Sequence, residues 1–96
     1  MKSHHFVAIA LASWYLMIPP IKDNRLYDKA PLGKWQIAAT LDSADDCKAK
    51  QQEFIRQGNQ LIVDPSKSVK LVARAELMAQ CVDSSDARIH SRLPTF

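Results

Sequence analysis

Cys47 and Cys81 are the residues of this chain best suited to chemistry. Thirty-three residues lie between them, so they do not form the Cys-x-x-Cys motif that redox dithiols use. Near the start of a helix, a free Cys47 would ionise more readily and act as a nucleophile. A structural disulfide is the other interpretation, and the choice depends on the compartment in which the protein resides.

The remaining reactive residues lack the partners that catalysis or metal binding needs. His90 and the two cysteines have no close spacing and fall short of the four ligands usual for structural zinc. Asp45 and Asp46 are adjacent, so on a helix they point about 100° apart and do not face each other. Asp83 and Asp86 lack the glycine and glutamate of a calcium loop and fit a solvated turn. We therefore expect no catalytic residue, no metal and no cofactor.

The composition is that of one small globular domain. The chain has 96 residues and a mass of 10.8 kDa, with 47% hydrophobic and 24% charged residues. Thirteen Lys and Arg against ten Asp and Glu give a formal charge of +3. That excess is too small and too scattered to indicate a nucleic-acid partner.

The N-terminus is typical of an export signal. A lysine precedes an apolar run over residues 6–12, and Ala10-Leu11-Ala12 fits the small-x-small pattern of signal peptidase, which predicts cleavage before Ser13. The alternatives are an uncleaved membrane anchor and a buried segment of a cytosolic protein. As a helix, the apolar stretch 6–18 would span about 20 Å, against about 30 Å of hydrocarbon. We predict a signal peptide over residues 1–12, a periplasmic or secreted protein and no stable membrane span.

Three segments of the mature chain are predicted to be β-strands. Residues 14–18 are apolar on both faces, which suits a central strand covered on both sides or an exposed adhesive strand. Residues 35–41 alternate, and their odd-numbered residues form the face expected to be buried. Residues 80–82 are a short third strand. Residues 21–34 have mixed charge and no periodicity, so they are expected to form a loop.

Two helices are predicted before the third strand. Ser43 and Asp46 fit a capping box at the start of the first helix, which is expected to stop at Gly58-Asn59. The second, over residues 65–78, has Asp64 as its expected N-cap. The second helix is expected to bury Val69, Leu71, Val72, Ala75 and Met78.

These elements predict an α+β domain over residues 13–83. We expect a small two- or three-stranded antiparallel sheet with two helices on one face and one disulfide. Residues 84–96 are polar and are expected to form a loosely ordered C-terminal tail.

Trp14, Tyr15 and Trp35 fall on two strands that are expected to pair. Core packing is one interpretation of the three aromatic residues. A surface patch that binds a partner is the other, because Trp and Tyr are common interface anchors. We retain the three as candidate partner-binding residues.

Several stretches resemble a group of small exported proteins of Gram-negative bacteria. The resemblance lies in Trp14-Tyr15-Leu16-Met17-x-Pro19-Pro20, Asp42-Ser43-Ala44-x-x-Cys47 and Cys81-Val82. It covers most of the mature chain and implies export and paired cysteines. It implies no activity and no catalytic residue.

Export decides between the two interpretations of the cysteines. Disulfides persist outside the cytosol, and a lone pair of cysteines in a small exported domain has one connectivity, so we predict a Cys47–Cys81 bond. The expected function is a non-enzymatic binding or structural module of the bacterial envelope, with a protein or another envelope component as partner. The alternatives are a small thiol-dependent redox protein that uses Cys47 and a membrane-anchored accessory subunit.

The processing site is the first testable prediction. Protein expressed with its own leader is expected to begin at Ser13, because the small-x-small pattern directly follows the apolar run. Intact-mass analysis of the purified protein measures this. Soluble protein that retains Met1 would contradict the export signal.

Overall fold

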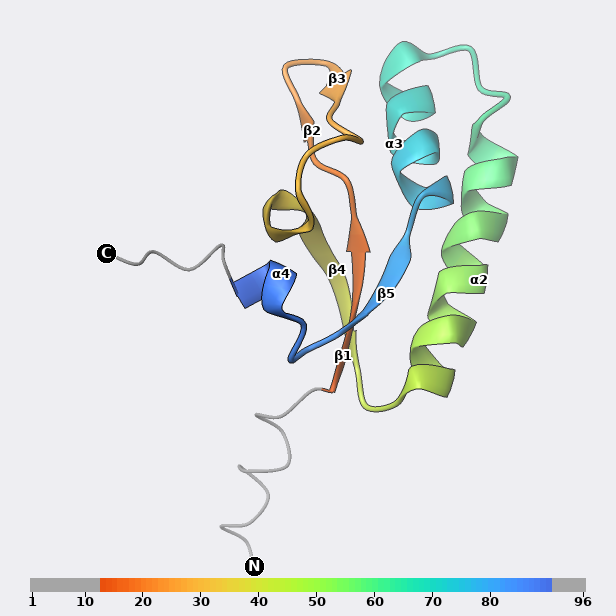
Figure 1. The fold of residues 1–96 in the computed structure, drawn as a ribbon. Helices are drawn as coiled ribbons and strands as arrows, with labels where there is room; N and C mark the ends of the chain where they lie inside the picture. Colours follow the sequence, from red (N-terminus) through yellow and green to blue (C-terminus); the bar gives the residue numbers. More distant parts are fainter. Residues whose placement is uncertain (1–12, 91–96) are drawn as a thin grey trace, which may run out of the picture.

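The computed structural model describes residues 13–90. The signal peptide expected over residues 1–12 and the last six residues lie outside the described residues. The described part has a three-stranded sheet, a two-stranded hairpin, two long helices and two short helical segments (Figure 1). This is the expected α+β class, closed by the Cys47–Cys81 disulfide.

The sheet is built around β1 (Trp14–Ile18). β4 (Gln36–Leu41) and β5 (Gln80–Asp83) pair with it on either side, both antiparallel. Leu16 and Met17, which point to opposite faces, are both fully buried. The apolar residues on both faces of this segment thus reflect a central strand covered on both sides, as one of the two interpretations predicted.

A β-bulge changes the expected alternation of β4. Met17 pairs with Ile37 and Leu16 pairs with Ala39, which leaves Ala38 without a partner on β1. Because of this extra residue, the odd-numbered side chains before the bulge and those after it lie on opposite faces of the sheet. Burial of all odd-numbered residues on one face is therefore a wrong prediction, and Ile37 is 42% exposed.

Residues 21–34 are more ordered than the predicted loop. β2 (Ile21–Lys22) and β3 (Arg25–Leu26) form a hairpin, and the 3₁₀ segment η1 (Leu32–Lys34) follows. Asp23 and Asn24 make the turn with φ of 54° and 61°. Two consecutive left-handed residues match the twist of a two-residue hairpin, and Asp and Asn tolerate this conformation best after glycine.

Helix α2 (Ala44–Leu61) begins where the sequence predicts. The Ser43 hydroxyl accepts a hydrogen bond of 3.0 Å from the Asp46 amide and so caps the helix. The expected stop at Gly58 is wrong, because the helix continues for three more residues. Gly58 is buried against the next helix, where a Cβ would lie 2.9 Å from the Ala73 carbonyl oxygen. The glycine therefore serves close helix packing.

Helix α3 (Lys67–Leu77) starts later than expected, with Ser66 as its N-cap. Asp64, the expected cap, instead accepts a hydrogen bond of 2.8 Å from the Ser66 amide and tightens the turn before the helix. The predicted burial holds for Leu71 and Ala75, but Val72 is 43% exposed. α3 packs along α2 and against the β2–β3 hairpin, so the small residues of its inner face are the ones covered.

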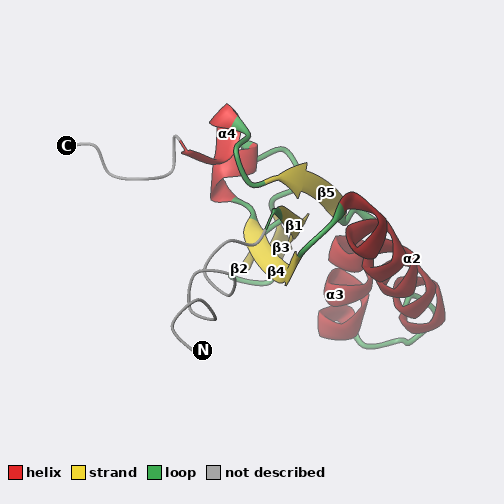
Figure 2. Cartoon of the chain, turned by 90° about the horizontal axis from the view of Figure 1, so that it is seen from below, coloured by secondary structure: helices red, strands yellow, loops and turns green. Residues whose placement is uncertain are grey.

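Two hydrophobic clusters lie on the two faces of the sheet. Figure 2 shows the sheet between α2 and α3 on one side and α4 on the other. On the α2 face, Leu16, Cys47 and Ala79 are buried together. On the opposite face, the buried residues come from β1, β5, the residue before β4 and the C-terminal segment of residues 84–90. That second cluster consists of Met17, Trp35, Val82 and Ile89.

The chain end is better ordered than expected over residues 84–90. They form a turn and the short helix α4 (Ala87–His90), and Ile89 is only 5% exposed. The prediction of a loose tail from residue 84 is therefore wrong for this part, while residues 91–96 lie outside the described residues. One apolar residue in a polar segment is a weak sequence signal, yet it completes the cluster around Trp35.

The α2–α3 packing generates the second prediction. Gly58→Ala is expected to lower the free energy of unfolding by about 1–3 kcal/mol, the range for overpacking, although alanine is the better helix former. The added Cβ would meet the Ala73 backbone at 2.9 Å, and a backbone atom yields less readily than a side-chain end. Asn59→Ala, at an exposed position of the same helix, is the control and is expected to be neutral or slightly stabilising. Urea unfolding measures both variants, and a stabilised Gly58→Ala protein would contradict the close approach.

Candidate functional site

The Cys47–Cys81 disulfide joins the first turns of α2 to β5, with 6.0 Å between the two Cα atoms. The Ser43 cap fixes the start of α2, so Cys47 faces the sheet, where it is fully buried. Phe54 packs on the same cluster. The predicted pairing is confirmed.

Because of this bond, neither cysteine is present as the free thiol that nucleophilic chemistry needs. The chain has two cysteines, and both sulfur atoms are in the disulfide. Cys47 has no solvent-exposed surface. In this oxidised form Cys47 acts as a structural cross-link between the helical layer and the sheet.

The three candidate partner-binding aromatics do not form one surface. Trp35 is 4% exposed and packs with Met17 on the α4 face, where its indole Nε1 donates a hydrogen bond of 2.9 Å to the Ala30 carbonyl. Tyr15 is half-buried against that same cluster. Trp14 is half-buried on the opposite face, beside the disulfide. The alternation of β1 separates the two neighbours, so the idea of a shared patch is wrong.

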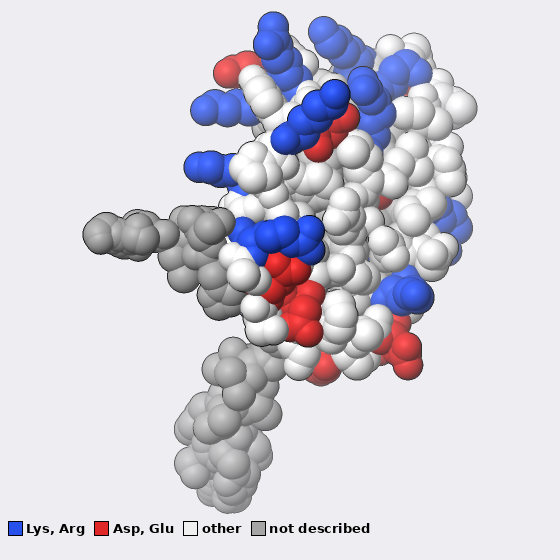
Figure 3. All heavy atoms as spheres, in the orientation of Figure 1, with Lys and Arg blue, Asp and Glu red and all other residues white. Residues whose placement is uncertain are grey.

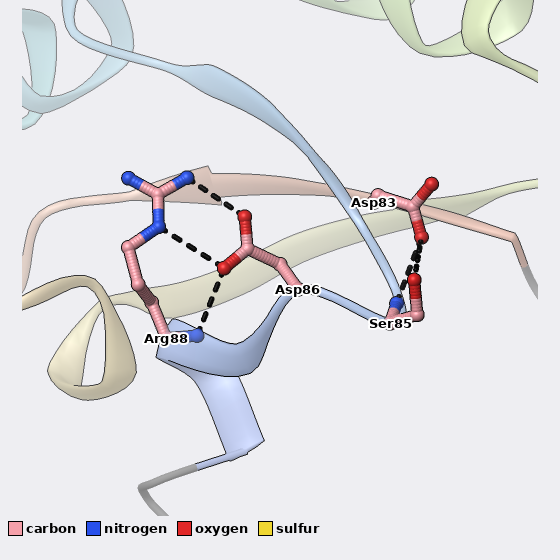
Figure 4. A network of polar contacts seen from close by, with 4 residues as sticks. All are labelled: Asp83, Ser85, Asp86 and Arg88. Atoms are coloured by element: carbon pink, nitrogen blue, oxygen red, sulfur yellow. Dashed lines mark hydrogen bonds and ion pairs between the residues drawn. The ribbon is translucent and has the colours of Figure 1, made fainter.

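The acidic residues near the chain end stabilise local turns (Figure 4). Asp83 accepts hydrogen bonds from the backbone amide and the hydroxyl of Ser85, at 2.8 and 2.7 Å, which lower the pKa of its carboxyl. Asp86 accepts from the backbone amide and the guanidinium of Arg88, and this pairing raises the pKa of the guanidinium. These contacts hold the start of α4 in place. Over residues 13–90, no group of three or more His, Cys, Asp and Glu side chains is arranged to hold a metal ion.

Glu76 is a half-buried acid on α3. Its Oε1 has no hydrogen-bond partner within the described residues, and burial raises the pKa of the carboxyl. The folded state binds the carboxyl proton of Glu76 more tightly than the unfolded state does, so protonation of this residue stabilises the fold. This stabilisation is fully present at pH values below the pKa of Glu76 in the unfolded state. It is lost as the pH rises through the pKa of the folded state, so this residue makes the fold less stable at neutral than at acidic pH.

A surface hollow of about 400 Å³ lies beside the hairpin, and sequence reasoning missed it. It is lined by Pro20, Lys22, Asp23, Tyr27, Ala30 and Lys34. All six lie within or next to the segment that was predicted to be a loop. The Asp-Asn pair between two short strands was the available signal, because it is typical of a two-residue hairpin turn.

Backbone hydrogen bonds fix both sides of this hairpin hollow. The Tyr27 amide donates to the Pro20 carbonyl at 2.9 Å and closes the base of the hairpin. The Lys34 amide donates to the Pro31 carbonyl at 2.8 Å and forms η1. The buried Trp35 indole holds the Ala30 carbonyl between them. The hollow is therefore largely preformed, as small-molecule sites usually are.

Positive charge gathers at this end of the molecule. Figure 3 shows Lys and Arg side chains over the hairpin and the neighbouring end of α3, with acidic side chains more frequent at the opposite end. Two lysines, Lys22 and Lys34, and one acid, Asp23, are the charged residues among those that line the hollow. Within residues 13–90, neither lysine takes part in an ion pair.

No known protein family, curated protein or solved structure matches this chain. Among the helices that the structure describes, none combines the length and the apolar character needed to cross a bilayer.

The disulfide generates the third prediction. The double variant Cys47→Ala/Cys81→Ala is expected to lower the free energy of unfolding by about 4 kcal/mol, the loop-entropy value for a closed loop of this size. Urea unfolding of the oxidised wild type and of the double variant measures the difference. Wild-type protein unfolded in reductant is the control and is expected to match the variant. A loss below about 1 kcal/mol would contradict a bond that holds the layers together.

Proposed function

We propose that this chain is an exported, non-enzymatic binding module of the bacterial envelope. The hairpin hollow is the observation that carries the proposal. It combines a preformed shape with an exposed tyrosine and three charged residues from the β2–β3 hairpin and η1. Loops held by a rigid scaffold are where binding residues concentrate.

The cross-link supports the location. A disulfide that ties a helix to a sheet, with Cys47 fully buried, is stable in an oxidising compartment, where periplasmic and secreted proteins reside. It also supports the class of function, because both cysteines are bound in the cross-link instead of being available as nucleophiles. A redox protein that uses Cys47 would have to open this bond first, at a cysteine that is fully buried.

Sedimentation with isolated envelopes tests the proposal. Protein exported from its own leader in a Gram-negative host is recovered by osmotic shock, and then mixed with envelope fragments of the same host. Wild-type protein is expected in the periplasmic fraction and in the envelope pellet. The double variant Lys22→Gln/Lys34→Gln is expected to lose most of this sedimentation, because both lysines line the hollow.

The control is Lys48→Gln, which removes one exposed charge near the start of α2, at the end of the molecule away from the hairpin. It is expected to sediment like the wild type. Wild-type protein that stays in the supernatant would contradict the binding function. Recovery from the cytosol would contradict the location, and a double variant that sediments fully would show that the hollow is not the site.

A further inference from the structure

We infer that the hairpin hollow binds an acidic saccharide, meaning a sugar ring that carries a phosphate or a carboxylate. This inference rests on the proposed binding function and names the ligand class of the same site. Three features of the lining select this class: a pair of lysines, an exposed tyrosine ring and a carboxylate.

The lysines select an anionic group. Lys22 comes from β2 and Lys34 from η1, so two separate segments each place a lysine in the lining of one hollow. With one carboxylate from Asp23, the lining keeps a net positive charge. Phosphate and carboxylate oxygens accept charge-assisted hydrogen bonds from such groups, and the surrounding basic end of the molecule favours their approach (Figure 3).

Tyr27 selects a ring with an apolar face. Its side chain is 39% exposed, and Pro20 and Ala30 extend the apolar wall beside it. A pyranose ring presents one face of C–H groups, which packs on an aromatic side chain while the hydroxyls stay at the edge. An inorganic anion has no apolar face and would make no such packing contact with this wall.

Asp23 selects hydroxyl groups. Asp23 lies on the hairpin turn and lines the hollow, and it takes part in no ion pair within residues 13–90. An ionised carboxylate only accepts hydrogen bonds, so it suits the hydroxyl donors of a sugar and repels a simple polyanion. A hollow of about 400 Å³ is at the small end of ligand sites and fits one or two sugar rings.

Titration with defined ligands tests the inference. The oxidised protein, recovered from the periplasm, is titrated with glucose 1-phosphate, glucuronic acid, glucose and inorganic phosphate, and binding is followed by calorimetry. At least one of the two acidic sugars is expected to bind more tightly than both glucose and inorganic phosphate, by about tenfold or more. Whichever acidic sugar binds more tightly identifies the anionic group.

Variants separate the three contributions. Lys22→Gln and Lys34→Gln are each expected to weaken binding of the acidic sugar by about threefold to tenfold, the effect of one charge-assisted contact at a half-open site. Tyr27→Leu is expected to weaken it similarly, whereas Tyr27→Phe keeps the ring and is expected to bind like the wild type. Lys48→Gln is the matched charge control and is expected to have no effect.

Glucose or inorganic phosphate binding as tightly as the acidic sugars would overturn the inference. So would the absence of any binding at millimolar concentration, or a Tyr27→Leu variant that binds normally. If the wild type still sediments with envelopes through its two lysines but binds none of the sugars, the ligand class is wrong and the binding function stands.

Discussion

The covalent bond between α2 and β5 is the constraint on which the two-layer arrangement depends. A domain of this size buries little apolar surface, and within residues 13–90 the largest fully buried side chains are Leu16, Met17, Pro19 and Cys47. One of these four belongs to the disulfide itself. The bond therefore reduces the conformational entropy of the unfolded chain. It also places a packed sulfur atom in the contact between helix and sheet.

The hairpin hollow depends on this core indirectly. β1 leads through two prolines into the hairpin, and the indole of Trp35 holds the loop that returns to β4. Trp35 is itself fixed by Met17 of β1 and by Ile89 of α4. α3, which packs on the disulfide-linked α2, supports the hairpin from the other side. A small exposed site is thus held by two buried clusters that meet at the central strand.

Local sequence patterns predicted the features that depend on neighbouring residues. The Ser43 cap is one example, because the helix start follows from a side chain three residues before its partner amide. Features set by contacts between distant segments could not be predicted in this way. Gly58 has the sequence signature of a helix stop, and only the approach of α3 shows why the helix continues through it. The bulge at Ala38 likewise follows from the pairing with β1, and no property of the strand alone fixes its position.

The candidate site also has a part that the sequence predicts and a part that it does not. The disulfide was predictable from the cysteine count and the expected compartment, but the hollow depends on the hairpin geometry of residues 21–26.

We propose that the protein works outside the cytosol as a disulfide-closed scaffold. Peptide mapping of the protein isolated from its native host, alkylated and digested without reductant, tests this proposal most directly. The account predicts one linked peptide pair that contains Cys47 and Cys81 and no alkylated cysteine. Two alkylated cysteines in folded native protein would contradict it.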